Sequence, residues 1–164
     1  AIIALGVATT FTSCKKEETE DPVITYGSLS GMAYANLDET NDTLPDGTPD
    51  TQYENVPSGT MVIAVVNPMD YTDNPDATVN YENVTYETTV GTDGSYTFNQ
   101  IEAYTKEATV TIKFADFAHE TTDYTVDING DPVKSSTRHI YTKADETVTL
   151  VANDVRVVDV IYAY

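Results

Sequence analysis

The stretch ATVTIKF, residues 108–114, alternates strictly between apolar and polar side chains. In an extended chain Val110, Ile112 and Phe114 share one face, and the threonines and the lysine share the other. A period of two is typical of a β-strand that covers an apolar core with one face, whereas a helix needs a period of 3.6. The pattern therefore predicts a sheet in this part of the chain.

Other stretches continue the same theme. Shared faces are also predicted for Tyr96 and Phe98 in SYTF, for Tyr124, Val126 and Ile128 in DYTVDI, and for Val148 and Leu150 in TVTL. MVIAVV at 61–66 is apolar on both faces and predicts a central strand, and VRVVDVIYAY at 155–164 predicts one long closing strand. The opening stretch, 24–37, contains Gly27 and Gly31, which indicate a bulge or a close backbone approach.

Turn signals separate these stretches. Asp93-Gly94 in TDGS predicts a short β-hairpin, Asn129-Gly130 in INGD offers another turn, and residues 67–77 form a longer loop with two prolines. The chain is rich in Thr, Tyr and Val, which favour strands, and no window of helical period reaches a convincing length. We therefore predict an all-β fold, a β-sandwich of about eight to nine strands.

Three elements in order resemble one known layout: Ser30-Gly31 in the opening strand, PSGTMVIAVV around 59–65, and TDGSYTF at 92–98. The order is similar to that of prealbumin-like (transthyretin/Ig-like) sandwiches, namely carboxypeptidase regulatory-like domains and the B-type repeats of Gram-positive surface adhesins. The resemblance covers roughly residues 27–101. It implies a prealbumin-like sandwich and says little about function.

The single cysteine, Cys14, lies between an uncharged, mostly apolar stretch, residues 1–13, and an acidic one. Residues 1–13 are too short to span a bilayer and resemble the end of a secretory signal peptide whose first residues are missing. Small residues before the cysteine, Thr12 and Ser13, resemble the lipobox of bacterial lipoproteins, in which the thiol is acylated and the chain is cut before it. The alternative is a buried free cysteine, but the charged residues that follow cannot pack around one.

The residues after Cys14 suggest a destination. Bacteroidetes lipoproteins exported to the outer face of the outer membrane often carry Lys with Asp or Glu directly after the cysteine, and Lys15, Lys16, Glu17 and Glu18 resemble this signal. The alternative is a solvated tether. We expect a signal remnant at 1–13, a lipidated acidic tether at 14–23 and a β-sandwich domain at 24–164. We also expect an outer-membrane location, on the cell surface rather than the periplasmic face.

The formal net charge is −19, from 27 acidic and 8 basic residues. Nucleic-acid binding needs clustered Lys and Arg, so this charge argues against a nucleic acid as a partner. Cations, neutral glycans and proteins with basic surfaces are the partners that such a surface attracts or tolerates.

Residues 37–50, LDETNDTLPDGTPD, form the most acidic loop of the predicted domain. Calcium takes six to eight oxygen ligands, and the candidate ligands here are Asp38, Asn41, Asp42, Asp46 and Asp50. Related adhesin repeats bind calcium in a corresponding loop, although the spacing differs here; the alternative is a solvated acidic loop. In the same loop Asp42-Thr43-Leu44 matches the Bacteroidetes O-glycosylation pattern, with Thr43 as the acceptor.

No signature of catalysis is present. The chain has two histidines, His119 and His139, but no nucleophile motif such as G-x-S-x-G, and His119 is expected to lie in a loop. We therefore predict no enzyme activity and no catalytic residues. The twelve tyrosines suggest glycan binding as an alternative function, because sugars stack on exposed aromatic faces. Tyr53, Tyr71 and Tyr81 are the candidates for exposure, whereas Tyr26, Tyr86, Tyr96 and Tyr124 are expected to face the core.

These observations predict a lipid-anchored β-sandwich of the cell envelope that acts as a non-catalytic interaction or accessory module for a protein partner. The alternative is a glycan-binding or adhesive surface lipoprotein. A structural subunit of a surface polymer is a third reading, and it would need an exposed sheet edge.

Overall fold

The computed structural model describes residues 24–72 and 75–164, and this part of the chain is all β, with two short 3-10 helices. The strands are β1 (Thr25–Ala35), β2 (Glu54–Asn55), β3 (Met61–Val66), β4 (Val84–Thr89), β5 (Ser95–Ala103), β6 (Ala108–Phe114), β7 (Phe117–Val126), β8 (Pro132–Tyr141), β9 (Glu146–Leu150), β10 (Val155–Val157) and β11 (Val160–Tyr162). The 3-10 helices are η1 (Glu39–Asn41) and η2 (Pro68–Asp70). No helix in the described ranges is long and apolar enough to cross a membrane.

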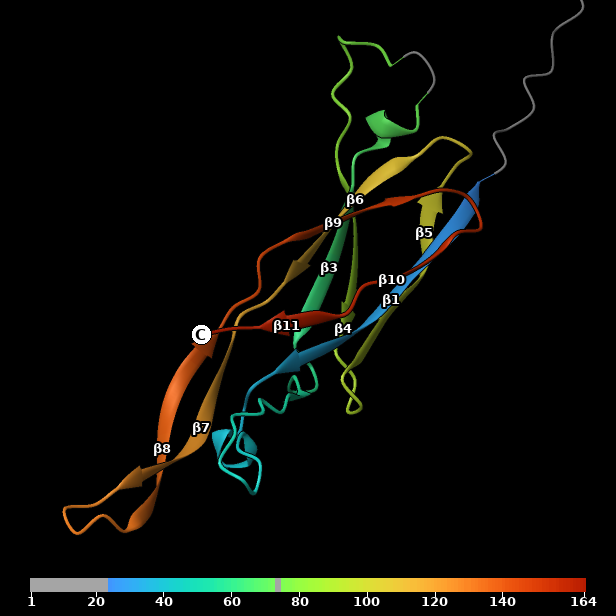
Figure 1. The fold of residues 1–164 in the computed structure, drawn as a ribbon. Helices are drawn as coiled ribbons and strands as arrows, with labels where there is room; N and C mark the ends of the chain where they lie inside the picture. The colour runs from blue at the N-terminus through green and yellow to red at the C-terminus, as the bar shows by residue number, and fades with distance from the viewer. Residues whose placement is uncertain (1–23, 73–74) are drawn as a thin grey trace, which may run out of the picture.

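Two sheets form the body of a β-sandwich (Figure 1). One has the order β4-β3-β6-β9 and is antiparallel throughout, so β3 is a central strand as predicted. The other is built around β1, which pairs antiparallel with β5 and β2 and parallel with β10 and β11. The described residues contain eleven strands, more than the eight or nine expected, because several of them are only two or three residues long.

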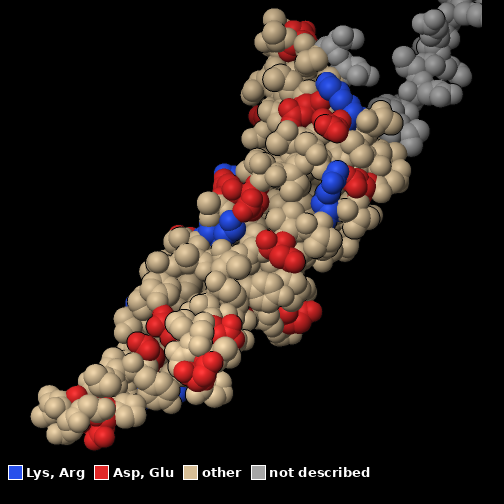
Figure 2. Space-filling model, in the orientation of Figure 1, with Lys and Arg blue, Asp and Glu red and all other residues tan. Residues whose placement is uncertain are grey.

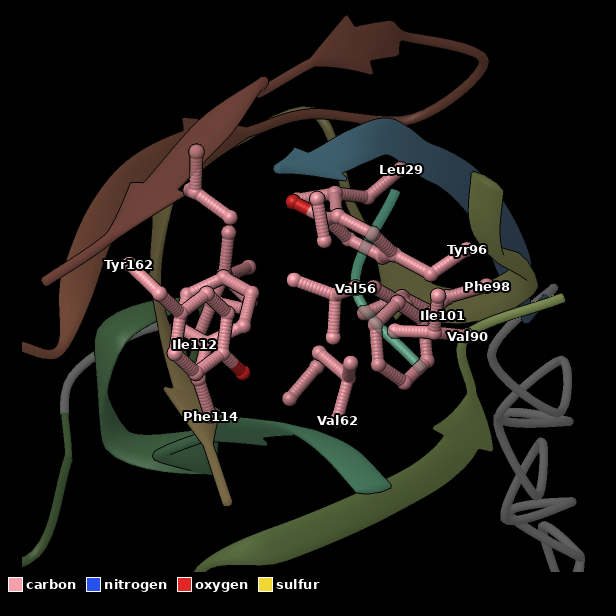
Figure 3. Packing of buried hydrophobic residues seen from close by; sticks show 14 of the residues in the cluster. Leu29, Val56, Val62, Val90, Tyr96, Phe98, Ile101, Ile112, Phe114 and Tyr162 are labelled. Carbon is pink, nitrogen blue, oxygen red and sulfur yellow. The ribbon is translucent and has the colours of Figure 1, made fainter. Parts of the chain in front are cut away.

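The core lies between the two sheets, where alternating side chains meet (Figure 3). Val110, Ile112 and Phe114 of β6 are buried, as the alternation predicts, and so are Tyr96 and Phe98 of β5. Phe114 packs edge-on against both Tyr96 and Tyr162, with ring centroids 5.8 and 6.1 Å apart. Other members of the core are Leu29, Val56, Val62, Val90, Ile101 and Leu150.

The opening strand contains both features that its glycines indicated. Its register against β5 shifts between Gly27 and Leu29, which is the predicted irregularity. A Cβ atom on Gly31 would lie 1.8 Å from the carbonyl oxygen of Val158, so the two backbones approach too closely for any side chain.

Two predictions about connections were wrong. Asp93-Gly94 does form a turn, with Gly94 at φ +80°, but β4 and β5 belong to different sheets and do not form a hairpin. Residues 155–164 form two short strands rather than one. Both keep the same register against β1, and they are separated where the Asp159 carboxylate, instead of a backbone carbonyl, accepts the hydrogen bond of the Met32 amide at 2.8 Å.

Strands β7 and β8 pair with each other and extend from one end of the sandwich (Figure 1). The Asn129-Gly130 turn closes this hairpin, with Gly130 at φ +87°. Tyr124, Val126 and Ile128 were predicted to share a face, but Tyr124 does not reach the core: the three side chains are 56%, 74% and 102% exposed. The physical reason is that Tyr124 lies on the face of β7 opposite the buried Thr121, and that within 24–72 and 75–164 no second layer covers this part of the hairpin.

Candidate functional site

A pocket of about 230 Å³ lies where the end of β1, the β1–β2 loop, the end of β8 and the last strand come together. From the first half of the chain it is lined by Asn36, Thr51 and Tyr53, and from the second half by Tyr141, Ile161, Tyr162, Ala163 and Tyr164. We call it the tyrosine pocket because four of these eight side chains are tyrosines. Two other depressions, one between β4 and β5 and one within the β3–β4 loop, contain one tyrosine each.

The floor of the tyrosine pocket is part of the hydrophobic core. Tyr141 and Tyr162 are 0% and 2% exposed, and Phe117 packs against both, with ring centroids 5.1 and 5.2 Å away. The Tyr141 hydroxyl donates to the carbonyl oxygen of Asn36 at 2.6 Å. Because a phenol has a single proton, the Thr121 hydroxyl must be the donor in its own 2.5 Å bond to Tyr141. The floor is therefore fixed by packing and by hydrogen bonds.

The rim is more open. Tyr53, Ile161 and Tyr164 are 48%, 51% and 58% exposed, so apolar surface is available at the mouth. The Tyr164 ring lies on that of His139, with centroids 3.9 Å apart. Its hydroxyl donates to the Glu39 carboxylate; that hydrogen bond, followed by burial and nearby negative charge, raises the pKa of Tyr164 to about 12.

Asn36 gives the pocket wall an unused acceptor. Its Nδ2 donates to Oδ2 of Asp42 at 2.6 Å, whereas its Oδ1 is buried and has no hydrogen-bond partner among the described residues. Buried polar atoms in folded proteins are nearly always paired, so this atom, which belongs to a residue that lines the pocket, still lacks the hydrogen-bond donor that such atoms normally have.

The carboxylate of Glu54 organises the loop that carries this wall. Oε2 accepts hydrogen bonds from the amides of Leu37 and Asp38 at 2.7 and 3.2 Å, and Oε1 accepts one from Asn41 at 3.0 Å. Since Glu54 directly follows Tyr53, these bonds also fix the backbone next to a rim tyrosine.

The candidate calcium ligands all lie in this loop, but each carboxylate is used locally. Asp38 caps η1 through Thr40, Asp46 accepts from the Thr48 amide at 2.9 Å and Asp50 from Gln52 at 2.7 Å. Asp42 binds Asn36 and the Gln52 amide, and Asn41 binds Glu54. Within 24–72 and 75–164, no three His, Cys, Asp or Glu residues lie close enough to hold a metal ion. The structure therefore does not bring the predicted calcium ligands together into a metal site.

Of the three tyrosines expected to be exposed, only Tyr53 is largely exposed and lies in the pocket. Tyr71 is half-buried and stacks on Tyr104 at 4.6 Å, and burial raises its pKa to about 12. Tyr81 is half-buried as well, and its hydroxyl accepts a hydrogen bond from the Asp76 amide at 3.1 Å.

Of the four tyrosines expected to face the core, Tyr96 is buried, and Tyr86 is partly buried and packs against the core. Tyr26, however, is 42% exposed near the start of β1, and Tyr124 is exposed on the hairpin, so both of these predictions were wrong. Both side chains lie on the face of their strand opposite the buried one, because the buried positions are Gly27 and Leu29 in β1 and Thr121 in β7.

One of the two histidines, His119, occupies a different place from the one expected. His119 lies in strand β7 rather than in a loop, directly opposite His139 of β8, and His139 supports the rim residue Tyr164. The sequence did not single out Asn36, Tyr141, Tyr162 or Tyr164 as site residues. The density of tyrosines near 162–164 was the one available signal. Cys14 and Lys15–Glu18 lie outside the described residues, and Thr43 is exposed in the β1–β2 loop.

Acidic side chains are scattered over the face shown in Figure 2, with few basic ones between them. Near the tyrosine pocket, the carboxylates of Glu39 and Asp42 each bind a residue that lines it. The electrostatic surroundings of the pocket are therefore negative.

No protein-family model and no curated protein matches the chain. Among solved structures, the chain is similar to one from Pseudomonas aeruginosa described as that of "a putative carbohydrate binding protein", with 14% identity and a TM-score of 0.34. The match covers 84% of this chain and 89% of that one. A likeness this weak supports no statement about what the present chain binds.

Proposed function

We propose that this chain is a non-catalytic carbohydrate-binding module of a bacterial cell envelope. The tyrosine pocket is the observation that carries this proposal. It combines exposed aromatic and aliphatic surface at the rim, a rigid floor and an unused hydrogen-bond acceptor in the wall.

The chemistry of the pocket suits a sugar ring. Sugars present C–H faces that pack on aromatic rings and hydroxyl groups that need polar partners. Tyr53 and Tyr164 offer the rings, and Asn36 Oδ1 offers an acceptor. The volume of about 230 Å³ is slightly below the range of roughly 300–1,000 Å³ that is usual for drug-sized ligands, which favours a single sugar unit.

The pocket is also organised before a ligand arrives. Tyr141 and Tyr162 are held in the core, and Glu54 fixes the loop next to Tyr53. A site that is already ordered loses little conformational entropy on binding, which matters for ligands as weakly apolar as sugars.

The lining groups fit binding better than catalysis. Of the described residues that line the pocket, none is Asp, Glu, His, Lys or Arg. General acid–base chemistry places an ionisable group within hydrogen-bond reach of the substrate. Phenols, a hydroxyl and an amide instead recognise hydroxyl groups.

The proposal places the module at the outer membrane, held by lipid on Cys14 and exported by the signal at Lys15–Glu18. Buried lipid methylenes contribute about 0.8 kcal/mol each to membrane attachment, and this attraction does not depend on the charge of the protein. A chain with a formal net charge of −19 needs such an anchor, because anionic lipid repels it.

The test is a sugar-binding screen with two matched variants. Monosaccharides and short oligosaccharides are titrated into the wild-type domain and followed by NMR chemical shifts. Tyr53→Ala removes an exposed rim tyrosine, and Tyr26→Ala removes a similarly exposed tyrosine from β1, outside the pocket. We expect Tyr53→Ala to weaken binding at least tenfold, about the 1–3 kcal/mol of a lost stacking contact, and Tyr26→Ala to leave it unchanged. A sugar that binds both variants equally, or no sugar bound at all, would contradict the proposal.

A second candidate function is docking of an envelope protein on the β7–β8 hairpin. The observation in its favour is the exposure of Tyr124, Val126 and Ile128 near the tip, since exposed apolar groups that gather in one place mark interaction surfaces. A photo-crosslinking residue at Ile128, used in cells, would capture one dominant envelope protein if this candidate is right. The same residue at Thr105, in the β5–β6 turn, is the control.

A further inference from the structure

We infer that the tyrosine pocket selects neutral sugars and rejects sugars that carry a carboxylate. This inference rests on the proposed function, because it names the ligand class of the same site. It follows from the hydrogen-bond inventory of the wall and from the charges directly behind it.

Two strong donors of the pocket are already engaged by carboxylates. Asn36 Nδ2 donates to Asp42 at 2.6 Å, and the Tyr164 hydroxyl donates to Glu39. An anionic ligand would have to compete with an internal carboxylate for each of them. Both existing bonds are already charge-assisted, so a ligand carboxylate that displaced one of them would gain little, and neither donor is free to neutralise a ligand anion.

Beside the hydroxyls of Thr51 and Tyr53, which can both donate and accept, the wall contains one group that can only accept. Asn36 Oδ1 is buried, has no partner among the described residues and can only receive a hydrogen bond. The hydroxyl of a neutral sugar can donate to it, whereas a carboxylate at the same position would place two acceptors together. The wall therefore suits a ligand rich in donors.

The surrounding charge acts in the same direction. Among the described lining residues there is no Lys, Arg or His to compensate a ligand anion. Glu39 and Asp42 each lie one hydrogen bond behind the lining, and Glu54 holds the same loop. Like charges brought together at an interface are unfavourable, which is a means of rejecting the wrong ligand.

The experiment compares matched pairs of probes on the folded domain. The methyl glycosides of glucose, galactose and mannose are each titrated beside the uronic acid that carries a carboxylate at C6, at pH 7 and low salt. We expect the neutral member of the pair that binds to bind roughly tenfold or more tightly than its uronate. Glu39→Gln retains an acceptor for Tyr164 and removes one charge, and it should narrow this ratio by about twofold.

Glu107→Gln is the control variant, because Glu107 lies far from the pocket. It directly precedes β6, and it is the opposite end of β6, at Phe114, that contacts the pocket residue Tyr162. It removes the same charge without changing the wall of the pocket and should leave the ratio unchanged. A uronate that binds as tightly as its neutral partner, with binding still lost in Tyr53→Ala, would overturn this inference and leave the proposed function standing. No Tyr53-dependent binding of any probe would overturn both.

Discussion

The hydroxyl group of Tyr141, at the end of β8, donates a 2.6 Å hydrogen bond to the carbonyl oxygen of Asn36, which follows β1 and is 105 residues earlier in the chain. Tyr141 also receives a hydrogen bond from Thr121 of β7, a side chain that is 2% exposed. One phenol thus connects the projecting hairpin to the opening strand, directly below the tyrosine pocket.

Removing this hydroxyl should destabilise the fold. Tyr141→Phe keeps the ring but leaves the buried Thr121 hydroxyl and the Asn36 carbonyl without a partner. We expect the free energy of unfolding to fall by about 1–3 kcal/mol, the cost of unsatisfied buried polar groups. Chemical denaturation measures it, and Tyr26→Phe, at an exposed tyrosine of β1, should change it by less than about 0.5 kcal/mol. Equal stability of the two variants would mean that the connection contributes nothing.

The close approach of β1 to the segment between β10 and β11, which runs beside it, gives a second prediction. In Gly31→Ala the new Cβ would lie 1.8 Å from the Val158 carbonyl oxygen and 2.9 Å from the Tyr96 hydroxyl. The first of these atoms is backbone, so β1 or the last strands must move apart. We expect a loss of about 3 kcal/mol or more, or loss of the cooperative transition, in denaturant unfolding. Ser30→Ala, one residue earlier and half-exposed, should be nearly neutral; a neutral Gly31→Ala would show that the close approach is not maintained in solution.

The core could be predicted well from the sequence where alternation and burial coincide. Val110, Ile112, Phe114, Tyr96 and Phe98 are buried as expected, because these side chains lie between the two sheets. Alternation assigns a side chain to a face but not a cover to that face. Tyr124 illustrates this, because it lies on the face of β7 opposite the buried Thr121, in a part of the hairpin where both faces are exposed.

Connections and the site depended on contacts that are distant in sequence. Asp93-Gly94 specified a turn, but whether the flanking strands pair is decided by β1 and β3, which take β5 and β4 as neighbours instead. The break in residues 155–164 reflects the Asp159 bond to Met32, 127 residues away. The tyrosine pocket draws Asn36, Tyr53, Tyr141 and Tyr162 from separate segments, so no local motif could announce it.

The turn carboxylates predict a specific response to acid. The Asp93 carboxylate accepts hydrogen bonds from the Ser95 hydroxyl and amide at 2.7 and 3.1 Å, which lower its pKa below the ordinary value of 3.8. Because the folded-state pKa is the lower one, this stabilisation is present above pH 3.8 and is lost as the pH falls through the folded-state value. Asp93→Asn keeps an acceptor that does not titrate, so its melting temperature should fall less steeply below about pH 4 than that of the wild type. Glu107→Gln controls for the change in net charge, and an identical slope in Asp93→Asn and wild type would contradict the assignment.

Calcium tests the acidic β1–β2 loop. As folded, Asp38, Asp46 and Asp50 each bind their own turn and Asp42 binds Asn36, so an ion would have to displace these hydrogen bonds. We expect millimolar calcium to leave the melting temperature unchanged relative to the same concentration of magnesium. A rise with calcium alone, abolished by Asp42→Asn, would show that the loop rearranges into the site that the sequence suggested.

The anchor can be tested independently of the pocket. The full precursor is produced in a bacterium that processes lipoproteins and labelled with palmitate. We expect the wild type to carry the label and to be extracted into a detergent phase. Burial of the acyl chains on Cys14 would contribute about 0.8 kcal/mol of binding free energy per methylene. Cys14→Ser should lose both label and extraction, whereas Ser13→Ala, which keeps a small residue before the cysteine, should retain them. An unlabelled wild type whose thiol resists alkylation until the protein unfolds would support the buried-cysteine alternative. It would also remove the membrane from the proposed function while leaving sugar binding by the tyrosine pocket to stand on its own test.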